Sequence, residues 1–124
     1  MVTKKRALPP GEAVPEEQRI EDLGGQLSAL LGELVATHLL TELDRRILSL
    51  RMGLEDGSCY TLNETAAILQ RSPELVRTRQ YLALKKHSRD LRFFKLLRDY
   101  ARTVKLPRGV TYYLYRYSDF EDHF

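Results

Sequence analysis

The sequence is poor in cysteine, since Cys59 is the only one among its 124 residues. A lone cysteine cannot form a disulfide within the chain, and no second cysteine or histidine cluster stands near it at metal-ligand spacing. His38, His87 and His123 are far apart and have no such partner either, so we interpret them as surface or helix-end residues. We therefore expect no disulfide and no bound metal, and Cys59 is interpreted as an incidental loop thiol.

A long apolar segment is also missing. No window approaches the roughly 18 uninterrupted apolar residues that a membrane span needs. The basic start, Lys4-Lys5-Arg6, runs into Pro9-Pro10 and not into the apolar core of a secretory signal. These absences favour a cytoplasmic protein that does not contact a membrane.

The common motifs of catalysis are absent as well. The sequence contains no glycine-rich phosphate loop, no nucleophile elbow and no paired histidine and carboxylate motif. We therefore expect no enzymatic activity and no cofactor. A binding function becomes the main hypothesis.

Charge is distributed unevenly along the chain. Residues 1–68 carry seven Lys/Arg and eleven Asp/Glu, a balance of −4, whereas residues 69–124 carry thirteen and six, a balance of +7. Between residues 71 and 108, twelve basic residues meet three acidic ones, a local balance of +9. Such a segment is typical of a surface that binds a polyanion such as DNA, and the alternative is a solvated helix face.

Apolar spacing predicts an all-α domain over residues 20–106. Residues 1–19 show no apolar periodicity and are interpreted as a flexible tail. From Ile20 to Leu40, apolar residues recur every three or four positions, which predicts an amphipathic helix. Thr41 is a suitable N-cap for a second helix, and Gly53 is a suitable stop.

Two short helices are predicted to meet at a tight corner. Thr61-Leu62-Asn63-Glu64 fits a capping box, which begins one helix, and Ser72-Pro73 supplies an N-cap and a first-turn proline for the next. Only Gln70-Arg71 separates them. So short a connection favours a helix-turn-helix over residues 61–87.

The second of these helices is expected to divide its residues between two faces. The apolar residues predicted to point inward are Leu75, Val76, Leu82, Ala83 and Leu84. Beyond His87, an apolar pattern resumes over residues 91–104, either as a fifth helix or as a continuation of the fourth.

The C-terminal residues 107–124 are rich in tyrosine. Val110 to Tyr117 combines β-branched and aromatic residues in the manner of a strand. A single strand needs a partner, so this arm would pack on its own domain, pair with a twin chain or bind a further protein. The predicted fold is a helix-turn-helix bundle of four to five helices with a C-terminal extended arm or strand.

Residues 40–89 resemble region 4 of bacterial sigma factors. The similarity runs through "LTELDRRILSLRMGL", a short acidic loop and "YTLNETA", and continues at Ser72, Glu74, Val76, Arg77 and the run Ala83-Leu84-Lys85-Lys86. Nothing in the sequence resembles the other sigma regions, so this chain alone is not expected to act as a complete sigma factor.

The resemblance implies promoter DNA as one partner. Carried over by position, Pro73, Glu74 and Thr78 would face base edges, and Arg77 with the helix start at Thr61 and Leu62 would face the DNA backbone. Pro73 stands where primary sigma factors have a base-reading arginine. The full set of predicted DNA-binding residues is Thr61, Leu62, Ser72, Pro73, Glu74, Arg77, Thr78, Arg79, Lys85 and Lys86.

The resemblance also implies RNA polymerase as a partner, through the flap of its β subunit. The residues expected to contact it are Leu43, Ile47, Leu50 and Leu54. Two alternatives remain open: a protein-binding module that keeps the fold without reading DNA, and a stand-alone repressor that dimerises through its C-terminal helix and strand.

Overall fold

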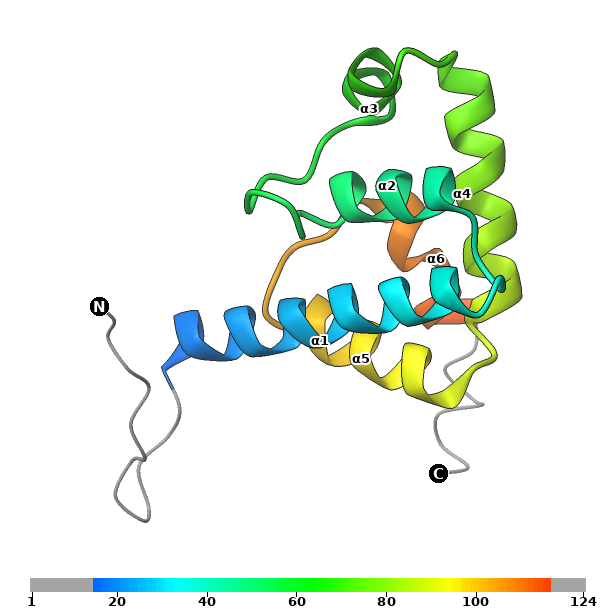
Figure 1. Ribbon diagram of the computed structural model, residues 1–124. Coiled ribbons are helices and arrows are strands. Elements are labelled where there is room, and N and C mark those ends of the chain that lie inside the picture. The colour runs from blue at the N-terminus through cyan, green and yellow to red at the C-terminus, as the bar shows by residue number, and fades with distance from the viewer. Residues whose placement is uncertain (1–14, 117–124) are drawn as a thin grey trace.

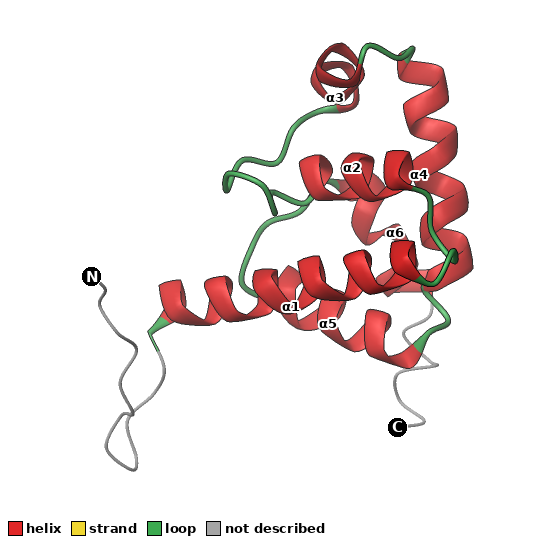
Figure 2. Ribbon diagram, in the orientation of Figure 1, coloured by secondary structure: helices red, strands yellow, loops and turns green. Residues whose placement is uncertain are grey.

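Helices and their connections make up the whole of the described structure (Figures 1 and 2). The computed structural model describes residues 15–116, with side chains as far as Tyr112. This part of the chain forms α1 (Glu16–Ala36), α2 (Glu42–Arg51), α3 (Leu62–Leu69), α4 (Pro73–His87), α5 (Leu91–Ala101) and α6 (Arg108–Arg116). The all-α expectation is therefore confirmed for residues 15–116. Among these helices, none has both the length and the apolar character needed to cross a bilayer.

Helix α1 begins and ends earlier than the sequence predicted. It starts at Glu16, where Pro15 occupies the N-cap position and two glutamates lie in the first turn, next to the positive end of the helix dipole. It ends at Ala36 because His38 adopts a left-handed conformation, with φ of 64°. The N–H of Leu39 then donates to the carbonyl of Leu34 at 2.8 Å, which closes the helix end.

Helix α2 has the boundaries that its capping residues predicted. The Thr41 hydroxyl accepts a hydrogen bond from the Asp44 N–H at 3.0 Å, as expected of an N-cap. The helix ends before Gly53, whose φ of 72° suits glycine, and a Cβ there would meet the Cys59 sulfur at 3.2 Å.

The main core lies between α1 and α5, which run side by side, and it extends to α2, α4 and α6 (Figure 1). We call this group the large cluster; among its most buried members are Leu27, Leu31, Phe93, Leu97 and Val110. A second group, which we call the small cluster, consists of Ile47, Ala66 and Val76, with Leu43, Leu62 and Leu69 packed against it. It joins α2 to α3 and α4.

The predicted strand at Val110–Tyr117 is wrong for residues 110–116, because this stretch belongs to α6. Val110 and Thr111 are both buried, at 0% and 7% exposure, whereas a strand would turn adjacent residues to opposite faces. A helix also satisfies its own backbone: the N–H groups of Val110 and Thr111 both donate to the carbonyl of Pro107. Packing against α4 and α5 thus overrides the β propensity of the sequence. A repressor that dimerises through a C-terminal strand would therefore have no such strand at residues 110–116.

Two further expectations are settled by the structure. The pattern after His87 forms a separate helix, since the chain turns at Ser88–Asp90 and Asp90 caps α5 with its side chain. Leu75 and Leu82 were expected to point inward, but they are 39% and 52% exposed. The large cluster covers α4 at Ala83 and Leu84, and the small cluster covers it at Val76. Within residues 15–116, neither cluster extends to the outer side of α4 at these two leucines.

Candidate nucleic-acid interface

The connection between α3 and α4 is short: it consists of Gln70, Arg71 and the N-cap residue Ser72. Gln70 adopts a left-handed conformation with φ of 57°. The N–H of Arg71 donates to the carbonyl of Ala66 at 3.0 Å, so the last turn of α3 is closed by hydrogen bonds. In Figure 1 α3 is seen end-on and α4 runs vertically, which shows that the two helices cross steeply.

Both helices start at the predicted capping residues. The Thr61 hydroxyl accepts from the Glu64 N–H at 3.1 Å, and a Glu64 carboxylate oxygen accepts from the Thr61 N–H at 2.9 Å. Ser72 accepts from the Leu75 N–H at 3.1 Å. The first-turn N–H groups of Leu62 and Asn63 have no partner within their helix, so the start of α3 can donate to an anion.

The first two turns of α4 present an open outer side. Pro73, Glu74, Arg77 and Thr78 are all exposed, while Val76 between them is 0% exposed and belongs to the small cluster. Arg77 donates to Glu74 at 2.7 Å, and both side chains are more than half exposed. An ion pair in water contributes little, so a phosphate can replace the carboxylate as the partner of Arg77.

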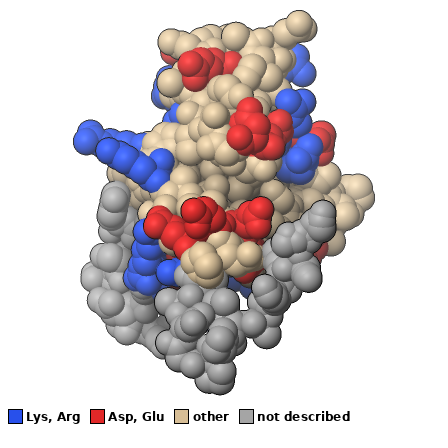
Figure 3. Space-filling view, turned by 90° about the vertical axis from the view of Figure 1, so that its left-hand side faces the viewer, with Lys and Arg blue, Asp and Glu red and all other residues tan. Residues whose placement is uncertain are grey.

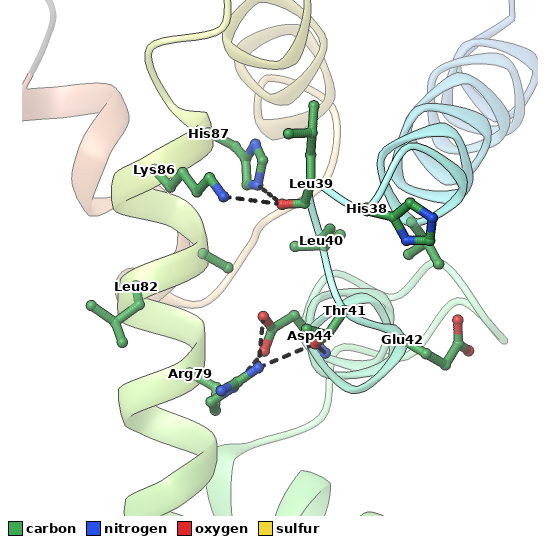
Figure 4. Close-up of a pocket in the computed structure, with 12 residues that line it drawn as sticks. His38, Leu39, Leu40, Thr41, Glu42, Asp44, Arg79, Leu82, Lys86 and His87 are labelled. Carbon is green, nitrogen blue, oxygen red and sulfur yellow. Dashed lines mark hydrogen bonds and ion pairs between the residues drawn. The ribbon is translucent and has the colours of Figure 1, made fainter.

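Arg79, which is among the predicted DNA-binding residues, is paired within the chain. Its Nε donates to an Asp44 carboxylate oxygen at 2.8 Å, and its Nη2 donates to the Thr41 hydroxyl at 3.2 Å. Figure 4 shows Arg79 and Asp44 pointing toward each other across the gap between α4 and α2. Arg79 therefore ties α4 to the start of α2 and does not project into solvent in the way that Arg77 does.

The last turn of α4 carries two exposed lysines and a buried histidine. The Lys85 ammonium lies over the Tyr81 ring, 5.7 Å from its centre, and Lys86 donates to the carbonyl of Leu39 at 3.4 Å. His87 is 6% exposed and its Nε2 donates to the same carbonyl at 3.0 Å (Figure 4). Burial lowers the pKa of His87, and the nearby Lys86 adds to this, so the ring is neutral at pH 7.

A buried arginine holds the middle of α4, and sequence reasoning missed its role. Arg51, at the end of α2, is 5% exposed; its Nε donates to the Gln80 side-chain oxygen at 2.6 Å and its Nη1 to the carbonyl of Tyr60 at 2.8 Å. Burial lowers the pKa of the Arg51 guanidinium. A Cβ at Gly109 would lie 3.2 Å from Gln80 Nε2, so α6 packs closely against this pair. The hint in the sequence was an Arg and a Gln at positions where the apolar patterns of α2 and α4 require core residues.

The other histidines and the cysteine form no chemical centre within residues 15–116. His38 is exposed at the end of α1, as predicted, and His123 lies outside the described residues. Cys59 is partly buried, and burial raises the pKa of its thiol against the opposing effect of Arg51. A thiol with a raised pKa is a poor nucleophile at neutral pH.

The side of the molecule opposite α4 has a different charge. Figure 3 shows the face that carries the N-terminal end of α1, where acidic side chains gather in groups and Lys and Arg lie at the edges. Glu16 and Glu17 lie in the first turn of α1. Acidic groups of this kind do not attract a polyanion, so the outer side of α4 is the better candidate.

The residues predicted to contact RNA polymerase are largely internal. Ile47 and Leu50 are 1% and 3% exposed, and Ile47 belongs to the small cluster. Leu43 and Leu54 are half-buried, Leu43 against the small cluster and Leu54 against the large one. Of the four, only Leu43 and Leu54 offer surface to a partner.

The predicted DNA-binding residues therefore fall into two groups. Thr61, Leu62 and the first turns of α4 lie at the corner, while Lys85 and Lys86 lie at the other end of α4.

Comparison with models of known protein families gave no match, and neither did comparison with characterised proteins or with solved structures.

Proposed function

We propose that this chain binds double-stranded DNA, with α3 and α4 acting as a helix-turn-helix like that of sigma factor region 4 and α4 entering the major groove. One observation carries the proposal: the first two turns of α4 are buried on the inner side at Val76 and open on the outer side at Glu74, Arg77 and Thr78. The strongly basic stretch of residues 71–108 supplies the attraction for phosphate.

The chemistry of the exposed groups suits some of them to DNA phosphates and others to base edges. Arg77, with the free N–H groups at the start of α3, suits phosphate oxygens, which set position and affinity. Glu74 can accept from a cytosine amino group, and the Thr78 side chain offers a hydroxyl and a methyl group to base edges. Pro73 has no hydrogen-bonding side chain, so the sequence preference rests on Glu74 and Thr78.

Salt dependence is the direct test of the DNA-docking proposal. Binding to a labelled duplex of roughly 30 base pairs, about three helical turns, is measured by fluorescence anisotropy from about 50 to 200 mM NaCl. With about three phosphates contacted by Arg77, Lys85 and Lys86, the slope of log affinity against log salt should be about −3. Arg77→Ala should make the slope shallower by about 1.

The matched control is Arg92→Ala. Arg92 is an exposed arginine on α5 that pairs with Glu33 at 3.1 Å, and α5 lies away from the corner between α3 and α4. This variant should keep the wild-type slope. Equal losses in the Arg77 and Arg92 variants, or an affinity that stays flat as salt rises, would show that α4 does not dock on DNA.

A second candidate function is binding to a protein, with the RNA polymerase β flap as the partner that the sigma resemblance implies. The observation that favours it is exposed apolar surface: Leu39 is 49% exposed, Leu75 39% and Leu82 52%. Core polymerase retained by the Arg77→Ala chain, together with no duplex binding by the wild type, would select this function over the first.

A further inference from the structure

The outer side of the second half of α4 contains two adjoining hollows. One, of about 510 Å³, lies between α4 and residues 38–44. The other, of about 570 Å³, is lined by Leu82, Lys85, Lys86 and Arg89. Leu82 and Lys86 line both, so the two hollows adjoin along these side chains; together we call them the α4 groove (Figure 4 shows the first of them).

The α4 groove combines apolar surface with positive charge at Lys85 and Lys86, since the two carboxylates that line its first hollow, Glu42 and Asp44, are paired with Arg45 and Arg79. Leu82 is 52% exposed at its centre and Leu39 is 49% exposed at its edge. Within residues 15–116, no carboxylate lies at ion-pair distance from Lys85 or Lys86, whose contacts are a tyrosine ring and a backbone carbonyl. A ligand that fits must therefore bring both carboxylates and apolar groups.

The sequence contains one segment of that chemistry next to the basic half of the chain. Residues 117–124 read Tyr-Ser-Asp-Phe-Glu-Asp-His-Phe, with three acidic residues, three aromatic residues and no Lys or Arg. By contrast, residues 69–116 carry thirteen Lys/Arg and three Asp/Glu. Residues 117–124 are thus acidic and aromatic, whereas the stretch of sequence before them is strongly basic.

The segment follows α6 directly in the sequence, and α6 packs against α4. Gly109 of α6 lies against Gln80 in the middle of α4. Eight residues in extended conformation span roughly 26 Å, and the 15 residues of α4 form a helix about 22 Å long. An extended segment of this length is therefore longer than the whole of α4.

We propose that residues 117–124 bind in the α4 groove, with Asp119, Glu121 and Asp122 facing Lys85 and Lys86, and with Phe120 or Phe124 covering Leu82. In this arrangement the acidic segment competes with other anions for Lys85 and Lys86. The proposal goes beyond the proposed function and does not depend on it, because it concerns contacts within one chain.

Zero-length carbodiimide cross-linking of the full chain tests the contact without using DNA. An equal mixture of unlabelled and nitrogen-15-labelled chains is cross-linked at low salt and mapped by mass spectrometry. We expect amide links from Lys85 or Lys86 to Asp119, Glu121 or Asp122, joining residues of the same isotope, and we expect them to be lost at about 1 M salt, where the Debye length is near 3 Å. Links of mixed isotope would assign the groove to a second copy, and the absence of links would also overturn the proposal.

A charge variant supplies an independent readout in solution. Asp119→Asn combined with Glu121→Gln and Asp122→Asn should shift the amide resonances of residues 82–89 relative to the wild type, and should expose Lys85 and Lys86 to faster acetylation. The matched control is Glu16→Gln with Glu17→Gln, which removes acidic groups at the far end of α1. Resonances of α4 that change equally in both variants, or in neither, would contradict docking of the segment in the groove.

Discussion

The corner formed by α3 and α4 and the body formed by α1, α5 and α6 are stabilised in different ways. The body shares the large cluster, in which Phe93 and Leu97 are at most 1% exposed. The corner rests on the small cluster of Ile47, Ala66 and Val76, and its buried Thr65 hydroxyl has no hydrogen-bond partner among the described residues. Apolar packing therefore stabilises the body, whereas the corner depends to a larger extent on the hydrogen bonds that cap its helices.

The two regions are joined by a few polar contacts along α4. Arg51 and Gln80 connect α2 to the middle of α4, and the Arg79 pair with Asp44 connects them again nearby. Since the corner buries little apolar surface of its own, we expect these contacts to couple its folding to that of the body.

Of the changes that test how the corner and the body are joined, removal of Arg51 should have the largest effect on stability. Arg51→Ala leaves the Gln80 side-chain oxygen and the Tyr60 carbonyl without their donor, and opens a cavity next to Gly109. We expect a loss of about 3 kcal/mol in the free energy of unfolding, measured by urea denaturation. An Arg45→Ala control, which removes an exposed pair with Glu42, should cost well under about 1 kcal/mol. Similar losses in the two variants would refute the role given to Arg51.

Removing one cap should have a smaller and more local effect. Ser72→Ala deletes the acceptor for the Leu75 N–H and should cost about 1 kcal/mol. In the corner, amides of α4's first turn should exchange faster with solvent, while those of α1 and α5 should change little. If amide exchange became equally faster in both regions, the corner and the body would unfold as one unit, and their stabilities would not be separate.

Acidification should give the smallest effect, at the contact between α4 and the end of α1. Because the pKa of His87 is lowered in the folded protein, the unfolded chain binds the proton more readily. The stability that the neutral ring provides is present above about pH 6.5 and is lost as the pH falls below it. Of the charged groups nearby, Lys86 lowers this pKa, whereas Asp90 and Asp44 raise it.

The His87 prediction is checked by urea midpoints at pH 7.5 and pH 5.5. His87→Gln keeps a donor for the Leu39 carbonyl and should reduce the fall in midpoint. His38→Asn changes an exposed histidine in a left-handed position that asparagine tolerates, and it should leave the fall intact. If both variants behave like the wild type, His87 is not the group that titrates.

The sequence predicted the corner well because its determinants are local. Thr41, Thr61 and Ser72 cap their helices with groups three residues away, and such spacing can be recognised in the sequence without knowledge of the fold. The helix at residues 108–116 could not be predicted in the same way. Its residues favour a strand, and only the burial of Val110 against α4 and α5 decides otherwise.

The candidate site was predicted only in part, for the same reason. The resemblance implied that Arg77 and Thr78 lie on the outer surface, and both are exposed, but the pairing of Arg79 with Asp44 joins residues far apart in the chain. Ile47 and Leu50 were expected to contact a partner and instead fill the interior. A single periodic pattern does not tell an apolar face that packs within the protein from one that binds another protein.

The most direct test of the DNA-docking account is a map of amide resonances as the full chain is titrated with a random-sequence duplex of roughly 30 base pairs. The account predicts that the largest changes lie at residues 61–65 and 72–78, with smaller ones at Lys85 and Lys86 and little change in α1 and α5. Changes centred on α1 or α5, with residues 72–78 unaffected, would contradict it.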